Sequence, residues 1–191
     1  MKRIFYLASL LLLLGIETML TAASLSYQDY LLLDENKVER IIDKYVKEKD
    51  DQFILKLNHY EVISDVSKPV VLEIAVLMDD FFGQFNEKFK GKMRKKGVPK
   101  IFVMKSKSSY QSMIKEYSDF DAPDWSAGLF VGGRRSALYC NYSIGDYAIQ
   151  VMKHEGLHQL LHAYIDGTIP PWFNEGTATV FETFNMANSM N

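Results

Sequence analysis

Three of the four histidines in this 191-residue chain lie within one short stretch, MKHEGLHQLLHAY, at residues 152–164. Within it, residues 154–158 read HEGLH and match the pattern H-E-x-x-H. Four residues of an α-helix correspond to about 400° of rotation, so His154 and His158 project from one face about one turn apart. Two neutral imidazoles placed in this way can bind one zinc ion, each nitrogen at about 2.0–2.1 Å.

Glu155 follows the first of these histidines directly. A rotation of about 100° separates it from His154, so it flanks the metal position without being a ligand. Zinc lowers the pKa of a water molecule that it binds to about 7, and a carboxylate beside it can then take a proton near neutral pH. The sequence therefore predicts Glu155 as the general base of a hydrolytic metal site.

A hydrolytic zinc site needs a third protein ligand and an open fourth position. His162 lies a further turn along the helix, about 6 Å along its axis, and a straight helix cannot bring three successive turns to one ion. We therefore expect His162 to be packed, hydrogen-bonded or outside the ligand set. Glu175 is the better third ligand, because a chain reversal at Asp166–Gly167 and the prolines 170–171 would place it early in a neighbouring helix.

The competing interpretation of residues 154–158 is a surface helix that carries the pattern by chance. With four histidines in the chain, composition alone would produce such a match in roughly one chain in a few hundred. Gly156 inside the helix costs about 0.5–1 kcal/mol relative to alanine, which suggests that a neighbouring element approaches closely there. Both considerations favour a metal site.

The motif and the later stretch 172-WFNEGTA-178 together resemble the gluzincins, the H-E-x-x-H metallopeptidases whose third ligand is a glutamate on the following helix. The closer similarity is to the peptidase-MA-like families, which pair the helix with a W-x-x-E-G-x-A signature. Segments 58–67 and 125–133 also look like earlier strands of those families, so the resemblance covers roughly residues 50–187.

This resemblance implies that His154, His158 and Glu175 bind zinc and that Glu155 acts as general base and then as general acid. It also implies that an edge strand near residues 128–131 pairs with an extended peptide substrate.

The chain departs from the family pattern at two places. Some gluzincins carry an acidic residue four positions after the third ligand to orient a zinc histidine, and here that position is Thr179. Glu182 either replaces it or is a solvated helix residue. Gluzincins also usually stabilise the oxyanion with a downstream Tyr or His, but residues 176–191 contain neither. The upstream candidates are Tyr139, Tyr142, Tyr147, His162 and Tyr164.

Hydrophobic periodicity and turn signals predict the elements that must position these residues. Three sites stand out: Ser108 or Ser109 as a helix cap before a face of Tyr110, Met113, Ile114 and Tyr117; Asp146 as the cap of the histidine-bearing helix; and Gly132–Gly133 as a hairpin turn. We expect an α+β fold with a mostly antiparallel sheet packed by helices. The expected elements are helix 34–49, strand 53–64, helix 68–90, strand 101–105, a helix before loop 119–126, hairpin 127–143, a helix to Tyr164, and helix 172–187.

The N-terminus has the features of a secretory signal peptide. Lys2 and Arg3 precede the apolar run 4–16, and the small residues 21–23 follow. An uncleaved anchor or a buried helix is the alternative, although the run is short for a membrane span. We therefore predict a signal peptide at 1–23, an N-terminal helical segment at 24–50 and a zincin-like domain at 51–191. The mature chain would be exported, periplasmic or secreted, with no stable membrane span.

Composition narrows the remaining possibilities. The net charge of −2 argues against nucleic acid as a partner. Cys140 is the only cysteine, so no internal disulfide can form, and we expect it to be a small buried hydrophobe. The basic run 92–100 is interpreted as a solvated helix end rather than a patch for anions.

These observations favour an exported zinc-dependent metallopeptidase that acts on a peptide or protein substrate. The first alternative is a zinc-binding scaffold or peptide-binding module of the same fold with little or no catalysis, and the second is a structural exported domain without metal. No pattern in the sequence indicates an oligomeric state.

Overall fold

The computed structural model describes residues 25–89, 98–165 and 167–183. In this part of the chain it contains the helices α2 (Tyr27–Leu31), α3 (Glu35–Tyr45), α4 (Lys68–Phe89), α5 (Lys107–Ser118), α6 (Tyr147–Tyr164) and α7 (Pro171–Glu182). The strands are β1 (Lys47–Lys49), β2 (Gln52–Lys56), β3 (Glu61–Ser64), β4 (Lys100–Met104), β5 (Gly128–Val131) and β6 (Ala137–Asn141), and a 3-10 turn spans Tyr142–Ile144. The predicted signal peptide at 1–23 lies outside the described residues.

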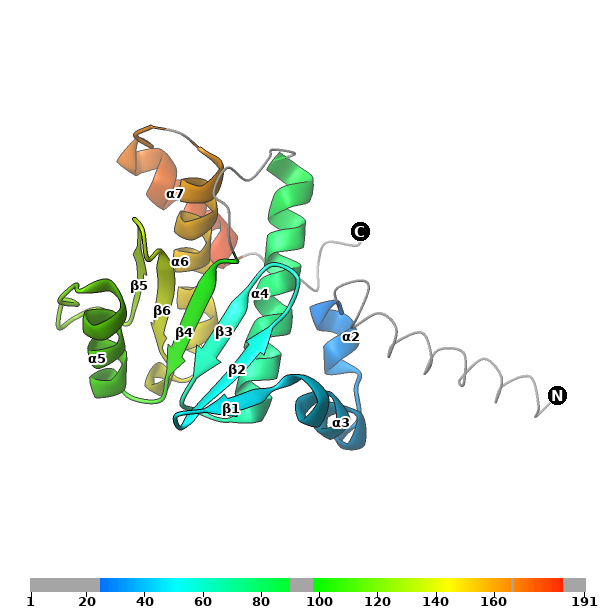
Figure 1. Cartoon of the computed structure of the whole chain (residues 1–191). Coiled ribbons are helices and arrows are strands. Elements are labelled where there is room, and N and C mark those ends of the chain that lie inside the picture. Colours follow the sequence, from blue (N-terminus) through cyan, green and yellow to red (C-terminus); the bar gives the residue numbers. More distant parts are fainter. Residues whose placement is uncertain (1–24, 90–97, 166, 184–191) are drawn as a thin grey trace.

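One mixed sheet of six strands, in the order β1-β2-β3-β4-β6-β5, forms the centre of an α+β fold (Figure 1). The three outer pairings, β1–β2, β2–β3 and β5–β6, are antiparallel. The two central pairings, β3–β4 and β4–β6, are parallel, so the expectation of a mostly antiparallel sheet is only partly met. The reason is that α4 and α5 carry the chain back along the sheet before the next central strand begins.

The stretch predicted as one strand over 53–64 is a hairpin of β2 and β3, closed by a hydrogen bond from Leu57 N–H to the Tyr60 carbonyl (3.0 Å). Residues 47–49, expected at the end of a helix, form β1 instead. Asp50 and Asp51 explain this difference, because both have positive φ values (51° and 58°) and reverse the chain directly after it.

The predicted helices are present, although some details at their ends differ from the expectation. Ser106, not Ser108 or Ser109, caps α5, and Ser109 completes a reciprocal capping box with it. Asp146 occupies the N-cap position of α6, as predicted, but its side chain makes no capping hydrogen bond. The final helix ends at Glu182 rather than at residue 187, and residues 184–191 are not described. The basic run 92–100 likewise falls mostly outside the described residues.

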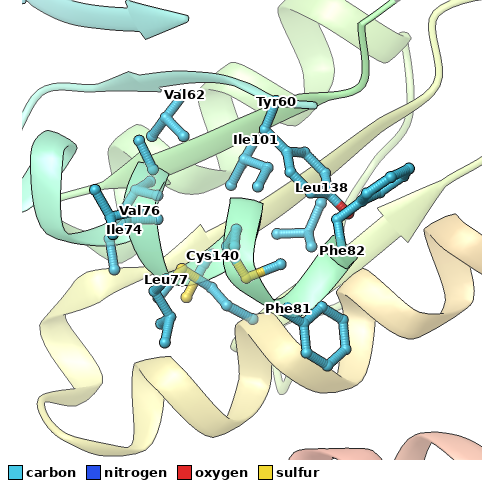
Figure 2. Close-up of a cluster of buried hydrophobic side chains, with 14 of the residues drawn as sticks. Tyr60, Val62, Ile74, Val76, Leu77, Phe81, Phe82, Ile101, Leu138 and Cys140 are labelled. Atoms are coloured by element: carbon cyan, nitrogen blue, oxygen red, sulfur yellow. The ribbon is translucent and has the colours of Figure 1, made fainter. Parts of the chain in front are cut away.

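Alternating strand residues divide the core between the two faces of the sheet. Val62, Ile101, Leu138 and Cys140 face α4 and α6, and Figure 2 shows these four side chains near α4 residues such as Phe81. On the opposite face, α5 packs its predicted apolar side against a second cluster. That cluster contains Ile63, Phe102, Met104, Tyr110, Ile114, Ala137 and Tyr139, with Met113 and Tyr117 beside it.

α4 is the longest helix among the described residues and packs against both the sheet and α6. In the described ranges no helix combines the length and the apolar character that crossing a bilayer requires.

At the N-terminal end of the described chain, α2 also rests on α4, where the Tyr27 hydroxyl donates to Glu73 (3.1 Å).

Gly156 is buried where α6 meets α4. A Cβ at this position would lie 2.7 Å from Met78 Cε and 3.5 Å from Phe81 Cε1. The close approach inferred from the sequence is therefore present, and it fixes how near α6 lies to the core.

Substituting Gly156→Val should lower the free energy of unfolding by about 1–3 kcal/mol, because the added methyl groups would overlap Met78 and Phe81. Gly83→Ala in α4 is the matched control, since nothing lies within 4 Å of its Cβ position and alanine should stabilise the helix by about 0.5–1 kcal/mol. Urea denaturation of both variants measures the difference. A Gly156→Val protein as stable as the wild type would contradict the packing described.

Cys140 is fully buried, and its burial raises the pKa of the thiol to about 12. In the unfolded chain the thiol pKa is about 8.5. The contribution of the neutral thiol to the free energy of unfolding should therefore be complete below that pH and fall as the pH rises toward about 12. At pH 8 a thiol-specific disulfide reagent should modify Cys140 at once in denaturant and only at the unfolding rate in buffer. Rapid modification of the folded chain would show that the thiol is accessible.

Candidate metal centre

α6 and α7 bring the three predicted metal ligands together. His154 and His158 project from one face of α6, as their spacing predicts, and Glu175 faces them from early in α7. One ligand atom from each of the three residues lies within 4.8 Å of the other two. The Nε2 atom of His154 is 3.4 Å from Glu175 Oε2, and the Nε2 atom of His158 is 3.7 Å from Glu175 Oε1.

Both imidazole rings are oriented by a second contact on their other nitrogen. His154 Nδ1 lies 2.7 Å from Glu182 Oε2, and His158 Nδ1 lies 3.0 Å from Asn174 Oδ1. Because each oxygen accepts a hydrogen bond, each Nδ1 carries the proton and each Nε2 keeps a free lone pair toward Glu175. This arrangement leaves Nε2 of each ring available to bind a metal ion.

Glu182 thus makes the contact that the sequence left open, since seven residues return it to the side of α7 that carries Glu175. Thr179 donates its hydroxyl hydrogen to the Glu175 carbonyl (3.0 Å) and does not orient a histidine. Asn174 was missed by sequence reasoning. Its only signal was its place directly before Glu175 in WFNEGTA, which puts it on the neighbouring part of the same helical turn.

Glu155 lies between the histidines and the edge of the sheet. Its Oε2 accepts a hydrogen bond from the backbone N–H of Phe130 in β5 (2.9 Å). Burial raises the pKa of Glu155, while the nearby His158 and His154 and the Phe130 N–H act in the opposite direction. The carboxylate is therefore held at one oxygen by β5 and lies beside the three candidate ligands without belonging to their cluster.

β5 can lie so close to α6 because residue 128 is glycine. A Cβ there would overlap Val151 Cγ1 and lie 3.3 Å from Glu155 Cγ. Any side chain at this position would push the strand away from the helix and lengthen the Phe130–Glu155 hydrogen bond.

A cleft of about 420 Å³ opens over these residues. β5, the two histidines, Glu155, Asn174 and Glu175 form one part of its lining, and the loop of Pro123, Trp125 and Ser126 forms another. Trp125 is 87% exposed at this place and offers an aromatic face to anything that enters the cleft.

Some backbone groups at the free edge of β5 already make hydrogen bonds within the chain. Ala127 accepts a backbone hydrogen bond from Asn141 N–H (2.9 Å), so Gly128 and Phe130 direct their N–H and C=O groups away from β6. Of these outward groups, Phe130 N–H is bonded to Glu155, and the Gly128 carbonyl accepts from Ser126 Oγ (2.9 Å).

The upstream candidates for stabilising an oxyanion separate clearly in space. Tyr139 is buried on the α5 face, and the Tyr164 hydroxyl donates to Asn86 of α4 (2.7 Å). Tyr142 and Tyr147 lie near the start of α6, and within the described chain none of these four tyrosines lines the cleft. His162 packs beside Phe130 of β5, with ring centroids 5.5 Å apart, and is outside the ligand cluster as expected.

The donor set fits a zinc ion. Two imidazole nitrogens and a carboxylate oxygen are ligands that zinc takes in hydrolases. Ligand atoms at about 2.0–2.1 Å from one ion in tetrahedral geometry are about 3.4 Å apart, close to the 3.4 Å and 3.7 Å between Glu175 and the two Nε2 atoms. Glu175, whose side chain is 61% exposed, leaves one side of the cluster open to the cleft.

Comparison with known proteins adds no relative: no family model, no curated protein and no solved structure matches this chain.

Replacing Glu182 by alanine should weaken zinc binding by about 10- to 100-fold, because His154 loses the partner that fixes its tautomer and orientation. Val180→Ala is the control, since this residue lies on the same helix and is 61% exposed. Competition with a chromophoric chelator measures both affinities. Equal zinc affinity in the two variants would exclude an orienting role for Glu182.

Proposed function

We propose that this chain is an exported zinc-dependent metallopeptidase of the gluzincin type, with a zincin-like active-site helix followed by the helix that carries the third ligand. The observation that supports it most is the convergence of His154, His158 and Glu175 beside Glu155, in a cleft bounded by an edge strand. The export step rests on the signal-peptide features of residues 1–23.

His154 Nε2, His158 Nε2 and one carboxylate oxygen of Glu175 would hold the ion. When bound, zinc would supply Lewis-acid chemistry, polarising a peptide carbonyl and lowering the pKa of a water molecule to about 7. Glu182 and Asn174 contribute by accepting a hydrogen bond from Nδ1 of each ring, which directs Nε2 toward the metal position.

Glu155 moves the proton in this proposal. Its Oε2 is held by Phe130 N–H, so Oε1 is the oxygen that takes a proton from the attacking water. As the C–N bond of the peptide breaks, the same oxygen donates that proton to the departing nitrogen, which leaves as an amine. The hydroxyl oxygen stays on the carbonyl carbon as the new carboxylic acid, so one water is consumed for each bond cleaved.

β5 would hold the substrate by strand addition, in a limited form. Since Phe130 N–H and the Gly128 carbonyl are already bonded within the chain, an incoming peptide would pair with Gly128 N–H and the Phe130 carbonyl. Two main-chain bonds give little affinity, so side-chain contacts, such as stacking on Trp125, would have to supply the rest.

The second candidate function is a zinc-binding, peptide-binding module without efficient catalysis. It is favoured by the absence of the four candidate tyrosines from the cleft lining in the described chain. Losing one oxyanion donor costs about 2.7–4 kcal/mol in other enzymes. Digestion of a broad peptide library separates the two functions: cleavage that a chelator stops supports the peptidase, and stoichiometric zinc without cleavage supports the module.

Glu155→Gln should keep zinc bound and lower the rate of peptide hydrolysis by about 10²- to 10⁴-fold, the usual contribution of a general base. The glutamine side-chain oxygen can still accept from Phe130 N–H, whereas Glu155→Ala removes that bond as well as the base. Hydrogen exchange at the Phe130 amide should therefore stay slow in the Gln variant and accelerate in the Ala variant. Unchanged hydrolysis by Glu155→Gln, with zinc content equal to the wild type, would refute the assigned role.

A further inference from the structure

Two arginines line a second pocket at the far end of β5. This pocket, which we call the arginine pocket, has a volume of about 340 Å³ and lies between the β5–β6 turn and the end of α5. Arg134 and Arg135 come from the turn, Ser118 comes from α5, and Val131 and Gly132 from the end of β5 also line it. Neither the metal ligands nor Glu155 takes part in it.

Arg135 is held in place by its surroundings. Its Nη1 donates to the Tyr117 carbonyl (3.3 Å), and its guanidinium lies 6.0 Å from the centre of the Tyr117 ring. The Ser118 hydroxyl donates to the Arg135 carbonyl (3.4 Å), so backbone and side chain are both attached to α5. Such a fixed, planar group loses little conformational freedom when it binds a carboxylate through two parallel hydrogen bonds.

The local charge favours an anion. Asp119 also lines the arginine pocket, but it is paired with Lys115 (3.3 Å), which pairs with Asp121 as well (3.1 Å). Arg134 and Arg135 together therefore exceed the unpaired negative charge at the pocket. Because Asp119 is already paired with Lys115, a carboxylate from a ligand can bind at the two arginines.

The arginine pocket and the cleft lie along the same strand. Gly128, Leu129 and Phe130 line the cleft, and Val131 and Gly132 line the arginine pocket. At about 3.3 Å per residue, Gly132 lies about 7 Å beyond Phe130. A peptide lying along β5 would therefore place one residue beside Phe130 and another, about two residues away, at the arginine pocket.

We propose that the arginine pocket is a specificity subsite that binds an aspartate or glutamate side chain of the peptide substrate. This inference rests on the proposed function, because β5 must hold an extended peptide. The expected substrates are peptides with an acidic residue at one fixed distance from the cleaved bond, whose side chain points toward α5.

The test is a digest of a peptide library by the zinc-loaded full chain. At one position, Asp and Glu should be preferred about tenfold over Asn and Gln. The double variant Arg134→Glu/Arg135→Glu should lose this preference and favour Lys or Arg there, while still cleaving peptides with alanine at that position. Arg40→Glu/Lys49→Glu is the matched control, since it makes the same charge change on α3 and β1, and it should keep the acidic preference.

The outcomes separate this inference from the proposed function. Cleavage that is indifferent to Asp or Glu, or an acidic preference that the control variant also loses, would overturn the subsite and leave the peptidase intact. If the wild type cleaves nothing, the proposed catalysis fails, and fluorescence anisotropy decides the subsite. Labelled peptides with Asp or Glu should then bind zinc-loaded Glu155→Gln about tenfold more tightly than their Asn or Gln counterparts, and equal binding would overturn the proposal.

Discussion

The hydrogen bonds that the two histidine rings donate to α7 are the constraint on which the site depends. Glu182 and Asn174 hold one Nδ1 each, and only with both rings so oriented do the two Nε2 atoms face Glu175. A single helix cannot supply three ligands to one ion, so the register between α6 and α7 decides whether the cluster exists at all. The chain reversal between the helices, and the packing of Ala178 into the main core, preserve that register.

On the other side of the site, two glycines allow neighbouring elements to approach α6 closely. Gly156 lets α6 lie against α4, and Gly128 lets β5 lie against α6. The two glycines place α6 between the core and the edge strand, at a distance where Glu155 reaches the Phe130 N–H. The proposed general base, Glu155, therefore also joins α6 to β5 through this hydrogen bond.

Much of this arrangement could be predicted from the sequence, because its signals are local. Periodicity placed α4, α5 and α6, and the spacing of His154 and His158 put them on one helix face. Other features depend on contacts between distant segments and left no local pattern. The parallel pairing of β3, β4 and β6 follows from where α4 and α5 return the chain, and the partnership of Asn174 with His158 needs the packed α6–α7 pair. The turn at Asp50–Asp51 was missed because the helical pattern of residues 34–49 gives no sign that the two aspartates adopt positive φ values and reverse the chain.

Zinc K-edge X-ray absorption of the purified, zinc-loaded chain, combined with its metal content, tests the central claim most directly. The account predicts one zinc per chain, coordinated by two imidazoles and at least one oxygen at about 2.0–2.1 Å, and the loss of that signal when His158 is replaced by alanine. A chain that retains no zinc, or whose zinc spectrum shows no imidazole and does not change in that variant, would contradict it.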